Sequence, residues 1–233
     1  MSSLAKPDEQ PHFDRSEMLM IHNMFRREFA LMPGLVGAVV AGEHDRAQII
    51  GDHVEAVIDI LHQHHTHEDE NIWPLLLDRC GESVASLVEL MQGQHRQVAT
   101  LLHQVDAALS IWRHAVTIES REALADVLGR LIPALKEHLN TEEDRVVPLM
   151  EHHVMAAEWT EFLKNESAAV DPDHLPLMLG MLMYEGDPES VEQVIATMSA
   201  DAGPVVRRLA APTFAAHSQR VHGTATPPRS TEL

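Results

Sequence analysis

Apolar side chains recur every three or four positions through the first two thirds of the chain, which is the spacing of an amphipathic helix. The pattern predicts four long helices, over about residues 16–42, 44–80 and 83–115, and from residue 120 to an end that Pro148 breaks. Their connections are short, and no stretch alternates apolar and polar residues in the way of a β-strand. Helices of this length with short connections pack best as an antiparallel up-down bundle, so we expect an all-α fold.

The last third of the sequence predicts shorter helices. Asp173 opens an apolar segment, and Asp187 followed by a proline is typical of a helix N-cap with proline at the first helical position. One more helix is expected over residues 202–222.

These patterns divide the chain into four parts. The bundle covers residues 16–153, and a helical appendage packed on it covers residues 154–223. The ends of the chain, residues 1–15 and 224–233, lack the periodic apolar pattern and are predicted to be disordered tails.

Composition narrows the kinds of partner and compartment. The chain has 17 Lys and Arg against 36 Asp and Glu, a formal charge of −19 that repels nucleic-acid phosphates and anionic lipids. The single cysteine, Cys80, cannot form an internal disulfide, and no segment has the form of a membrane span or a signal peptide. We therefore expect a cytoplasmic protein that binds neither nucleic acid nor membrane.

Seventeen histidines are the unusual feature of the composition, and several belong to an internal repeat. The segment HHTHEDENIWPLL from His64 matches HLNTEEDRVVPLM from His138 at an offset of 74 residues. Both segments carry His and Glu four residues apart, which puts the two side chains on one helix face. A lone histidine precedes each pair, His22 in the first helix and His95 in the third. Two similar helical hairpins would therefore face each other across a pseudo-twofold axis.

The turns place these groups at one level of the bundle. In antiparallel helices, two residues are level when the turn falls midway between them, and this holds for each successive pair of the four histidines. The four imidazoles and the two glutamates of the repeat would then share one buried layer. Buried polar groups need partners, so we predict two cations bridged by both carboxylates. Nitrogen and oxygen donors without thiolate favour iron over manganese or zinc.

With these residues in order, the sequence resembles the hemerythrin-like, HHE cation-binding family. The resemblance covers about residues 16–153, with a lone His, HHxxED before W-P-L, a second lone His, and HLxxEE before P-L. It implies a non-haem di-iron centre with bridging carboxylates and an oxo or hydroxo bridge, which binds or consumes a small oxidant such as dioxygen, peroxide or nitric oxide. The ligands implied by the match are His22, His64, Glu68, His95, His138 and Glu142, with Glu68 and Glu142 bridging.

One position departs from the oxygen-carrying members of that family, which have a second histidine four residues after the one in the third helix. Here that residue is Ala99. Each ion would then have two imidazoles and two carboxylate oxygens, and the open positions on both ions favour reaction with an oxidant over reversible carriage. His103 could replace the missing ligand only if its helix bends. The alternative function is an iron-handling or sensing module that acts through a protein partner.

Other polar residues near the repeat are given lesser roles. His65 and His67 are expected to be solvated or to orient ligands. A ferritin-like ferroxidase would need Glu-x-x-His on two helices and a zinc peptidase His-Glu-x-x-His, and neither pattern is present there. The acids beside the glutamates are expected to form a solvated face: Asp69, Glu70, Glu143 and Asp144.

Overall fold

The computed structural model describes residues 11–169 and 174–233, which are helical and form no β-strand. The expected all-α class is therefore confirmed. The first part of the chain forms α1 (Arg15–Gly37), α2 (His44–His67), the π-helical segment η2 (Glu68–Ile72), α3 (Trp73–Cys80), α4 (Glu82–Ala115), α5 (Ile118–Arg145) and α6 (Val147–His153). The second part forms α7 (Ala156–Ala169), α8 (Leu175–Met183), α9 (Pro188–Thr197), α10 (Ala202–His222) and the 3-10 turn η3 (Ser230–Glu232).

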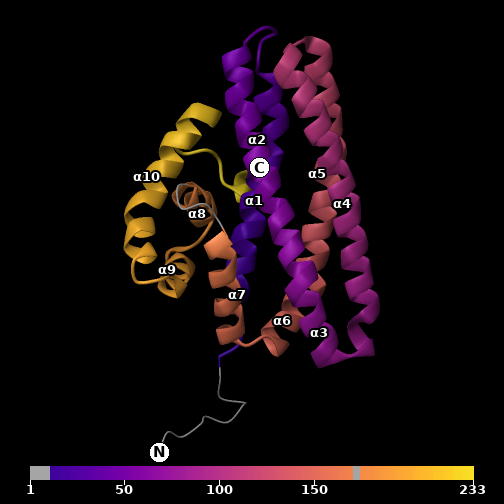
Figure 1. The fold of residues 1–233 in the computed structure, drawn as a ribbon, viewed down its shortest axis with the longest axis vertical. Helices are drawn as coiled ribbons and strands as arrows, with labels where there is room; N and C mark the ends of the chain where they lie inside the picture. Colours follow the sequence, from indigo (N-terminus) through magenta and orange to yellow (C-terminus); the bar gives the residue numbers. More distant parts are fainter. Residues whose placement is uncertain (1–10, 170–173) are drawn as a thin grey trace, which may run out of the picture.

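The long helices α1, α2, α4 and α5 lie side by side along the long axis of the molecule (Figure 1). The turns after α1 and after α4 meet at one end, where the Gly42 N–H donates to the Val116 carbonyl at 2.9 Å. The turn between α3 and α4, at Gly81, lies at the other end (Figure 1). Gly42 and Gly81 have φ of 84° and 61°, a conformation that glycine adopts without strain. The chain therefore reverses direction at each of these turns.

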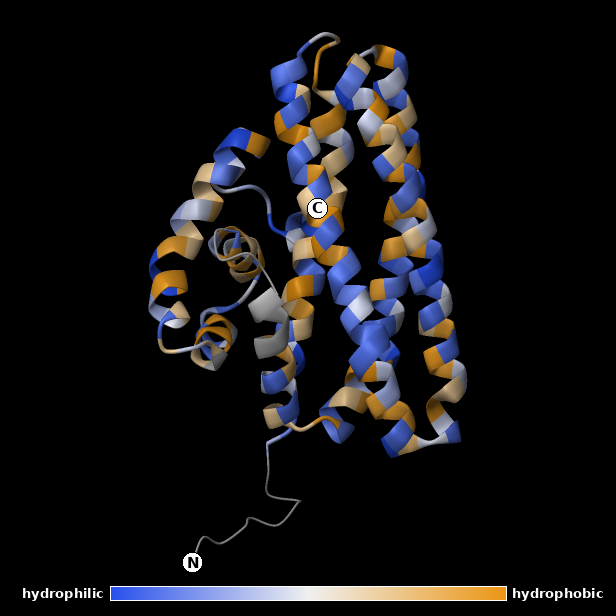
Figure 2. Cartoon of the chain, in the orientation of Figure 1, coloured by the Kyte–Doolittle hydropathy of each residue, from blue (hydrophilic) through white to orange (hydrophobic). Residues whose placement is uncertain are grey.

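A hydrophobic core holds these helices together. Each helix contributes buried side chains at helical spacing, such as Phe29 of α1, Leu61 of α2, Val105 of α4 and Leu131 of α5. Burying one such side chain stabilises the fold by about 1.5–3 kcal/mol. Figure 2 shows hydrophobic and hydrophilic residues interspersed along the long helices, as amphipathic helices require. Within the described residues, no helix combines the length and apolar character needed to cross a bilayer.

The first helix is shorter than its pattern predicts. α1 continues through Pro33 and ends at Gly37, whereas the prediction extended it to about residue 42. Gly34 and Gly37 follow the proline, and glycine lowers helix stability by about 1 kcal/mol relative to alanine. The chain therefore leaves the helix early and crosses to α2 in a longer turn.

The second predicted helix is divided by η2. The Trp73 N–H bonds to the Glu68 carbonyl five residues back, instead of the usual four. Pro74 follows, and it has no N–H with which to continue the ordinary pattern of bonds. Such π segments are frequent at functional sites, and this one begins at a residue of the predicted metal layer.

The C-terminal helices α7 to α10 lie beside α1 and α2 (Figure 1). The closest approach among them is between α8 and α10. A Cβ added at Gly180 would lie 2.4 Å from the Ala210 carbonyl oxygen, so this crossing requires a glycine.

Local signals in this part of the sequence predicted two features well. Asp187 caps α9 through bonds to its carboxylate from the N–H groups of Glu189 and Ser190, and α10 covers residues 202–222. Both signals are local, which is why the sequence alone could give them. The predicted start at Asp173 lies outside the described residues.

The N-terminal segment differs from its prediction as a disordered tail. Residues 1–10 lie outside the described residues, but Phe13 is buried, with its ring 4.7 Å from the Trp159 ring of α7. The Phe13 N–H also donates to the Val154 carbonyl at 2.9 Å. Contacts with a distant part of the chain order this segment, and a local pattern cannot predict them.

The C-terminal segment, residues 224–233, also differs from its predicted disorder. The Ser230 hydroxyl donates to the Glu185 carboxylate at 2.9 Å, and the Tyr184 hydroxyl donates to the Pro227 carbonyl at 2.8 Å. The segment thus returns from α10 toward α1 and ends in η3.

Candidate metal centre

The histidines and glutamates of the repeat meet in one layer among the four long helices. Two of these helices provide the lone histidines, and the His-x-x-x-Glu pairs come from α2 with η2 and from α5. All of these residues are at most 6% exposed. The structure brings together all six residues that the sequence selected: His22, His64, Glu68, His95, His138 and Glu142.

Two groups of possible donor atoms can be distinguished, and Glu68 belongs to both. Its Oε1 lies 3.0 Å from His64 Nε2, and its Oε2 lies 3.4 Å from His95 Nε2. The two oxygens of one carboxylate therefore face different groups, which is the arrangement that a bridging ligand requires. The first set is His22, His64, Glu68 and Glu142, and the second set is His65, Glu68, His95 and His138.

Glu142 also lies between the two sets. Its Oε2 is 3.4 Å from His22 Nε2 in the first set and 3.7 Å from His138 Nε2 in the second. The two glutamates that occupy matching positions in the repeat therefore occupy similar positions in the layer.

His65 is the member of the second set that sequence reasoning did not place there. It is 5% exposed, and its ring stacks on His95 with centroids 4.2 Å apart. Successive residues on a helix point about 100° apart, so His64 alone was expected to face the core. The available signal was the spacing of His65 and Glu68, because residues i and i+3 also share a helix face.

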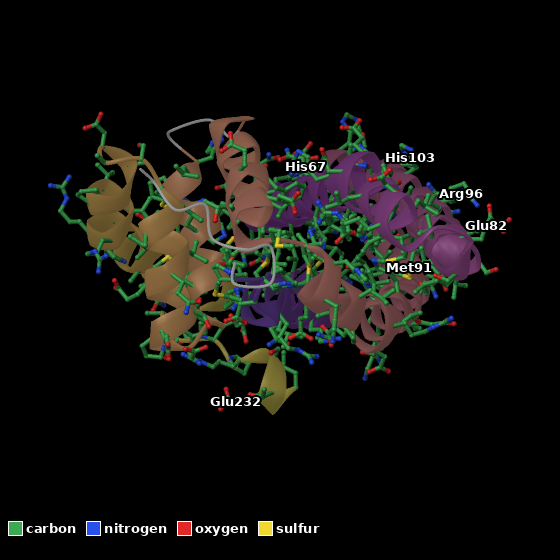
Figure 3. The ribbon with its side chains drawn as sticks, turned by 90° about the horizontal axis from the view of Figure 1, so that it is seen from below. His67, Glu82, Met91, Arg96, His103 and Glu232 are labelled. Carbon is green, nitrogen blue, oxygen red and sulfur yellow. The ribbon has the colours of Figure 1, made fainter. Side chains whose placement is uncertain are left out.

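The other histidines near the repeat do not join the layer. His103 is exposed and lies on the outside of α4 (Figure 3). α4 is one continuous helix, and the buried residues of its inner face include His95 but not His103. The imidazole that lies beside His95 therefore belongs to His65 of α2 and not to His103. His67 is half-buried beside α7, with its ring 5.7 Å from Phe162 (Figure 3).

The acid that follows each glutamate of the repeat holds a lone histidine of the other hairpin. His95 Nδ1 bonds to Asp69 Oδ1 at 2.9 Å, and His22 Nδ1 bonds to Glu143 Oε1 at 2.8 Å. Because an ionised carboxylate only accepts, each Nδ1 carries the proton and each Nε2 keeps its lone pair toward the layer. The Glu143 side chain is 18% exposed and departs from the predicted solvated face, whereas the Asp69 side chain is 40% exposed and remains in contact with solvent while it holds His95.

Further groups hold these two acids in place. Trp73 Nε1 donates to Asp69 Oδ1 at 2.8 Å, and Arg26 donates to the two oxygens of Glu143 at 2.7 and 3.0 Å. Burial raises the pKa of Glu143, but the bonds from His22 and Arg26 outweigh burial and lower this pKa to about 2. Glu143 is therefore a permanent acceptor for the His22 ring.

The inner donor atoms of the layer fit metal ions. The Nε2 atoms of His65, His95 and His138 are buried and have no hydrogen-bond partner among the described residues. Both carboxylate oxygens of Glu142 are also buried without a hydrogen-bond partner among the described residues. An unpaired buried polar group costs about 1–3 kcal/mol, so a layer with several of them requires a partner of another kind.

The protonation of these residues agrees with that interpretation. Burial and the neighbouring imidazoles lower the pKa of His138 to about 2 and the pKa of His65 well below its usual range. Both rings are therefore neutral, which is the form that binds a metal. Burial and the Glu68 carboxylate raise the pKa of Glu142 well above its usual range. A cation in the layer would replace the proton that Glu142 otherwise keeps.

An apolar cavity of about 110 Å³ reaches the first set from the side of the C-terminal helices. Its lining includes His64 and Glu68 of the first set. Helices from both parts of the chain form its walls, so α7 and α8 cover one side of the layer. Its apolar lining includes Met18, Met24, Trp159, Phe162, Met178 and Leu182.

Comparisons with known proteins agree with this site. A family model described as the hemerythrin HHE cation binding domain matches residues 15–150 and, in a second overlapping match, residues 86–201. The two matches begin 71 residues apart (86 − 15), close to the offset of the internal repeat. Searches of curated proteins and of solved structures gave no match.

Proposed function

Because the chain belongs to the hemerythrin HHE cation-binding family, we propose that its buried layer holds two iron ions between the helices of an antiparallel four-helix bundle. The observation that carries this proposal is the position of Glu68, whose two oxygens face two separate sets of imidazoles. Nitrogen and oxygen donors without thiolate suit iron, with manganese and zinc as weaker candidates.

Each ion would have its own ligands. The first would be held by His22, His64 and Glu142, with Glu68 shared between the ions. The second would have three imidazoles in addition to Glu68, because His65 joins His95 and His138. When bound, such a pair of ions supplies exchangeable coordination positions and one-electron oxidation steps.

The cavity determines which molecules reach the layer. Its lining includes His64 and Glu68, so a small ligand would arrive at the first set. Mostly apolar walls favour apolar molecules, because a charged or strongly hydrogen-bonding ligand would lose its hydration there. We therefore propose that the protein binds or consumes a small oxidant, with dioxygen and nitric oxide fitting the lining better than peroxide does.

A sensing or iron-handling role is the second candidate, and the walls of the cavity favour it. Trp159 and Phe162 of α7 and Met178 of α8 line the path to the layer. A ligand held there would contact these helices directly, and its binding would change how tightly they pack on α1. A protein partner that recognises α7 or α8 would then respond to the ligand.

Metal analysis with an absorption spectrum of the isolated protein tests the proposal. We expect two iron ions per chain and a ligand-to-metal charge-transfer band. Glu68→Ala and His138→Ala should lose iron and the band, whereas His103→Ala, which removes an exposed histidine, should retain both. Full iron retention in the first two variants, or a colourless protein that holds only zinc, would contradict the proposal.

Mixing the reduced protein with each oxidant separates the candidate roles. Catalytic loss of the oxidant indicates an enzyme, and a stable coloured adduct indicates a carrier. A rate of protease cleavage in the segment after residue 153 that changes when the oxidant binds indicates a sensor. Met178→Trp, which fills the cavity, should slow all of these responses without changing the iron content, and Met178→Ala should not slow them.

A further inference from the structure

A second group of buried imidazoles and a carboxylate lies outside the layer, where α10 meets α1 and α2. Glu28 of α1 and His53 of α2 are at most 1% exposed, and the side chain of His222, the last residue of α10, is 5% exposed. His53 is eleven residues from His64 along α2, which is about 16 Å at the rise of a helix. The group is therefore separate from the predicted di-iron layer.

The donor atoms of this group have the spacing of a mononuclear metal site. Glu28 Oε2 lies 3.1 Å from His53 Nε2 and 3.4 Å from His222 Nε2, and all three atoms lie within 4.8 Å of one another. Tetrahedral zinc with ligand distances of about 2.0–2.1 Å places its donors about 3.3 Å apart. Three protein ligands of this kind leave a fourth position for water.

His222 is the residue that hydrogen bonding does not explain. Its Nε2 is buried and has no hydrogen-bond partner in the described part of the chain. Its position is fixed, because Arg46 donates to the carbonyls of Arg220 and Val221 at the end of α10. His222 Nε2 thus lies 3.4 Å from Glu28 Oε2 without forming a hydrogen bond.

Surrounding groups orient the other two residues. His53 Nδ1 lies 3.1 Å from His217 Nε2, so the His217 ring can accept a hydrogen bond from His53. Metal-bound histidines usually donate their second nitrogen in this way. His53 Nε2 lies within hydrogen-bond distance of Glu28 Oε2, at 3.1 Å, and a bound cation would take the place of that bond.

The charges around Glu28 leave room for a cation. Arg27 donates to Glu28 at 2.7 Å and also to Glu185 at 2.6 Å. One guanidinium shared by two buried carboxylates leaves one negative charge to be balanced.

We propose that Glu28, His53 and His222 bind one divalent transition-metal ion, most suitably zinc, which joins α10 to the helical core. The nitrogen and oxygen donors and their spacing suit this ion. The site would stabilise the packing of the C-terminal helices, including those that line the cavity.

The experiment counts metals on the full-length chain. The protein is loaded with iron, dialysed against Zn²⁺ with a weak chelator, and its iron and zinc are measured separately. We expect about one zinc per chain, the number for a single three-ligand site, without loss of iron. Co²⁺ in place of Zn²⁺ should give the visible absorption of a four-coordinate site.

Variants assign the zinc to these residues. His222→Ala and Glu28→Gln should lose the zinc and keep the iron, and His217→Ala should weaken zinc binding by about 10–100-fold. His114→Ala, which removes an exposed histidine of α4, should keep the zinc. Circular dichroism verifies folding, and if Glu28→Gln does not fold, His222→Ala, at the end of α10, tests the site in its place.

Two results would overturn the inference. In the first, the wild-type chain takes up no more zinc than His222→Ala does. In the second, wild type and His217→Ala bind zinc with equal affinity, and the cobalt spectrum of His222→Ala is the same as that of wild type. Failure of the di-iron proposal would instead appear as missing iron in a chain that still binds this zinc.

Discussion

Replacing Asp69 or Glu143 with alanine tests how the layer is oriented, because each acid holds one lone histidine. Asp69→Ala removes the acceptor of both His95 Nδ1 and Trp73 Nε1. Glu143→Ala removes the acceptor of His22 Nδ1. Since His22 and His95 belong to different sets, each variant should weaken mainly one ion.

The structure sets the size of the effect. Loss of such an outer partner typically weakens metal binding by about 10–100-fold, which is about 1.4–2.7 kcal/mol. Asp69→Ala also leaves the Trp73 N–H buried without an acceptor, at a further cost to folding of about 1–3 kcal/mol. Asp69→Asn retains an amide oxygen that can accept, so its effects should be smaller than those of Asp69→Ala.

Iron binding in competition with a chelator measures these effects. In each variant, we expect one of the two iron ions to be lost at a lower chelator concentration and the other to remain nearly as in wild type. Glu70→Ala and Asp144→Ala are the matched controls, because each removes an exposed acid one residue further along. Equal weakening by variants and controls would show that only the local charge matters, and unchanged affinity in Asp69→Ala would refute the orienting role.

Three further predictions concern the layer, the cavity and the core. His65→Ala should weaken the second iron ion by more than about tenfold in the same chelator assay, whereas an unchanged affinity would remove His65 from the ligand set. Burial raises the pKa of Glu17 despite its bond from Trp159, so its stabilising contribution is present below pH 4.5 and is lost as the pH rises through the raised pKa. Glu17→Gln should therefore gain stability relative to wild type as the pH rises, and a pH-independent difference in urea unfolding would contradict this sign. Leu61→Ala, at a fully buried position, should lower the free energy of unfolding by about 2–5 kcal/mol, and a loss under about 1 kcal/mol would argue against tight packing there.

The layer was the best predicted feature of the protein. Helical periodicity gives the buried face of each helix, and a fixed rise per residue converts sequence distance into height. These two rules placed His22, His64, His95 and His138 at one level, where the structure brings them together. Neither rule requires knowledge of how the helices are rotated.

Contacts between helices were less predictable. Whether His65 faces the layer depends on the rotation of α2 and on the π segment that follows it, and neither is encoded in the apolar pattern. The bonds from His95 to Asp69 and from His22 to Glu143 depend on the distance between neighbouring helices. The sequence shows these acids only as charged residues beside a glutamate.

The sequence by itself determined the helices, the repeat and the common height of its polar groups, because these follow from local geometry that every helix shares. The tertiary structure alone decided the third imidazole of the second set, the cavity beneath α7 and α8, and the meeting of His222 with Glu28 and His53. Glu28 and His222 are 194 residues apart (222 − 28), and no periodic signal relates positions that only packing brings together.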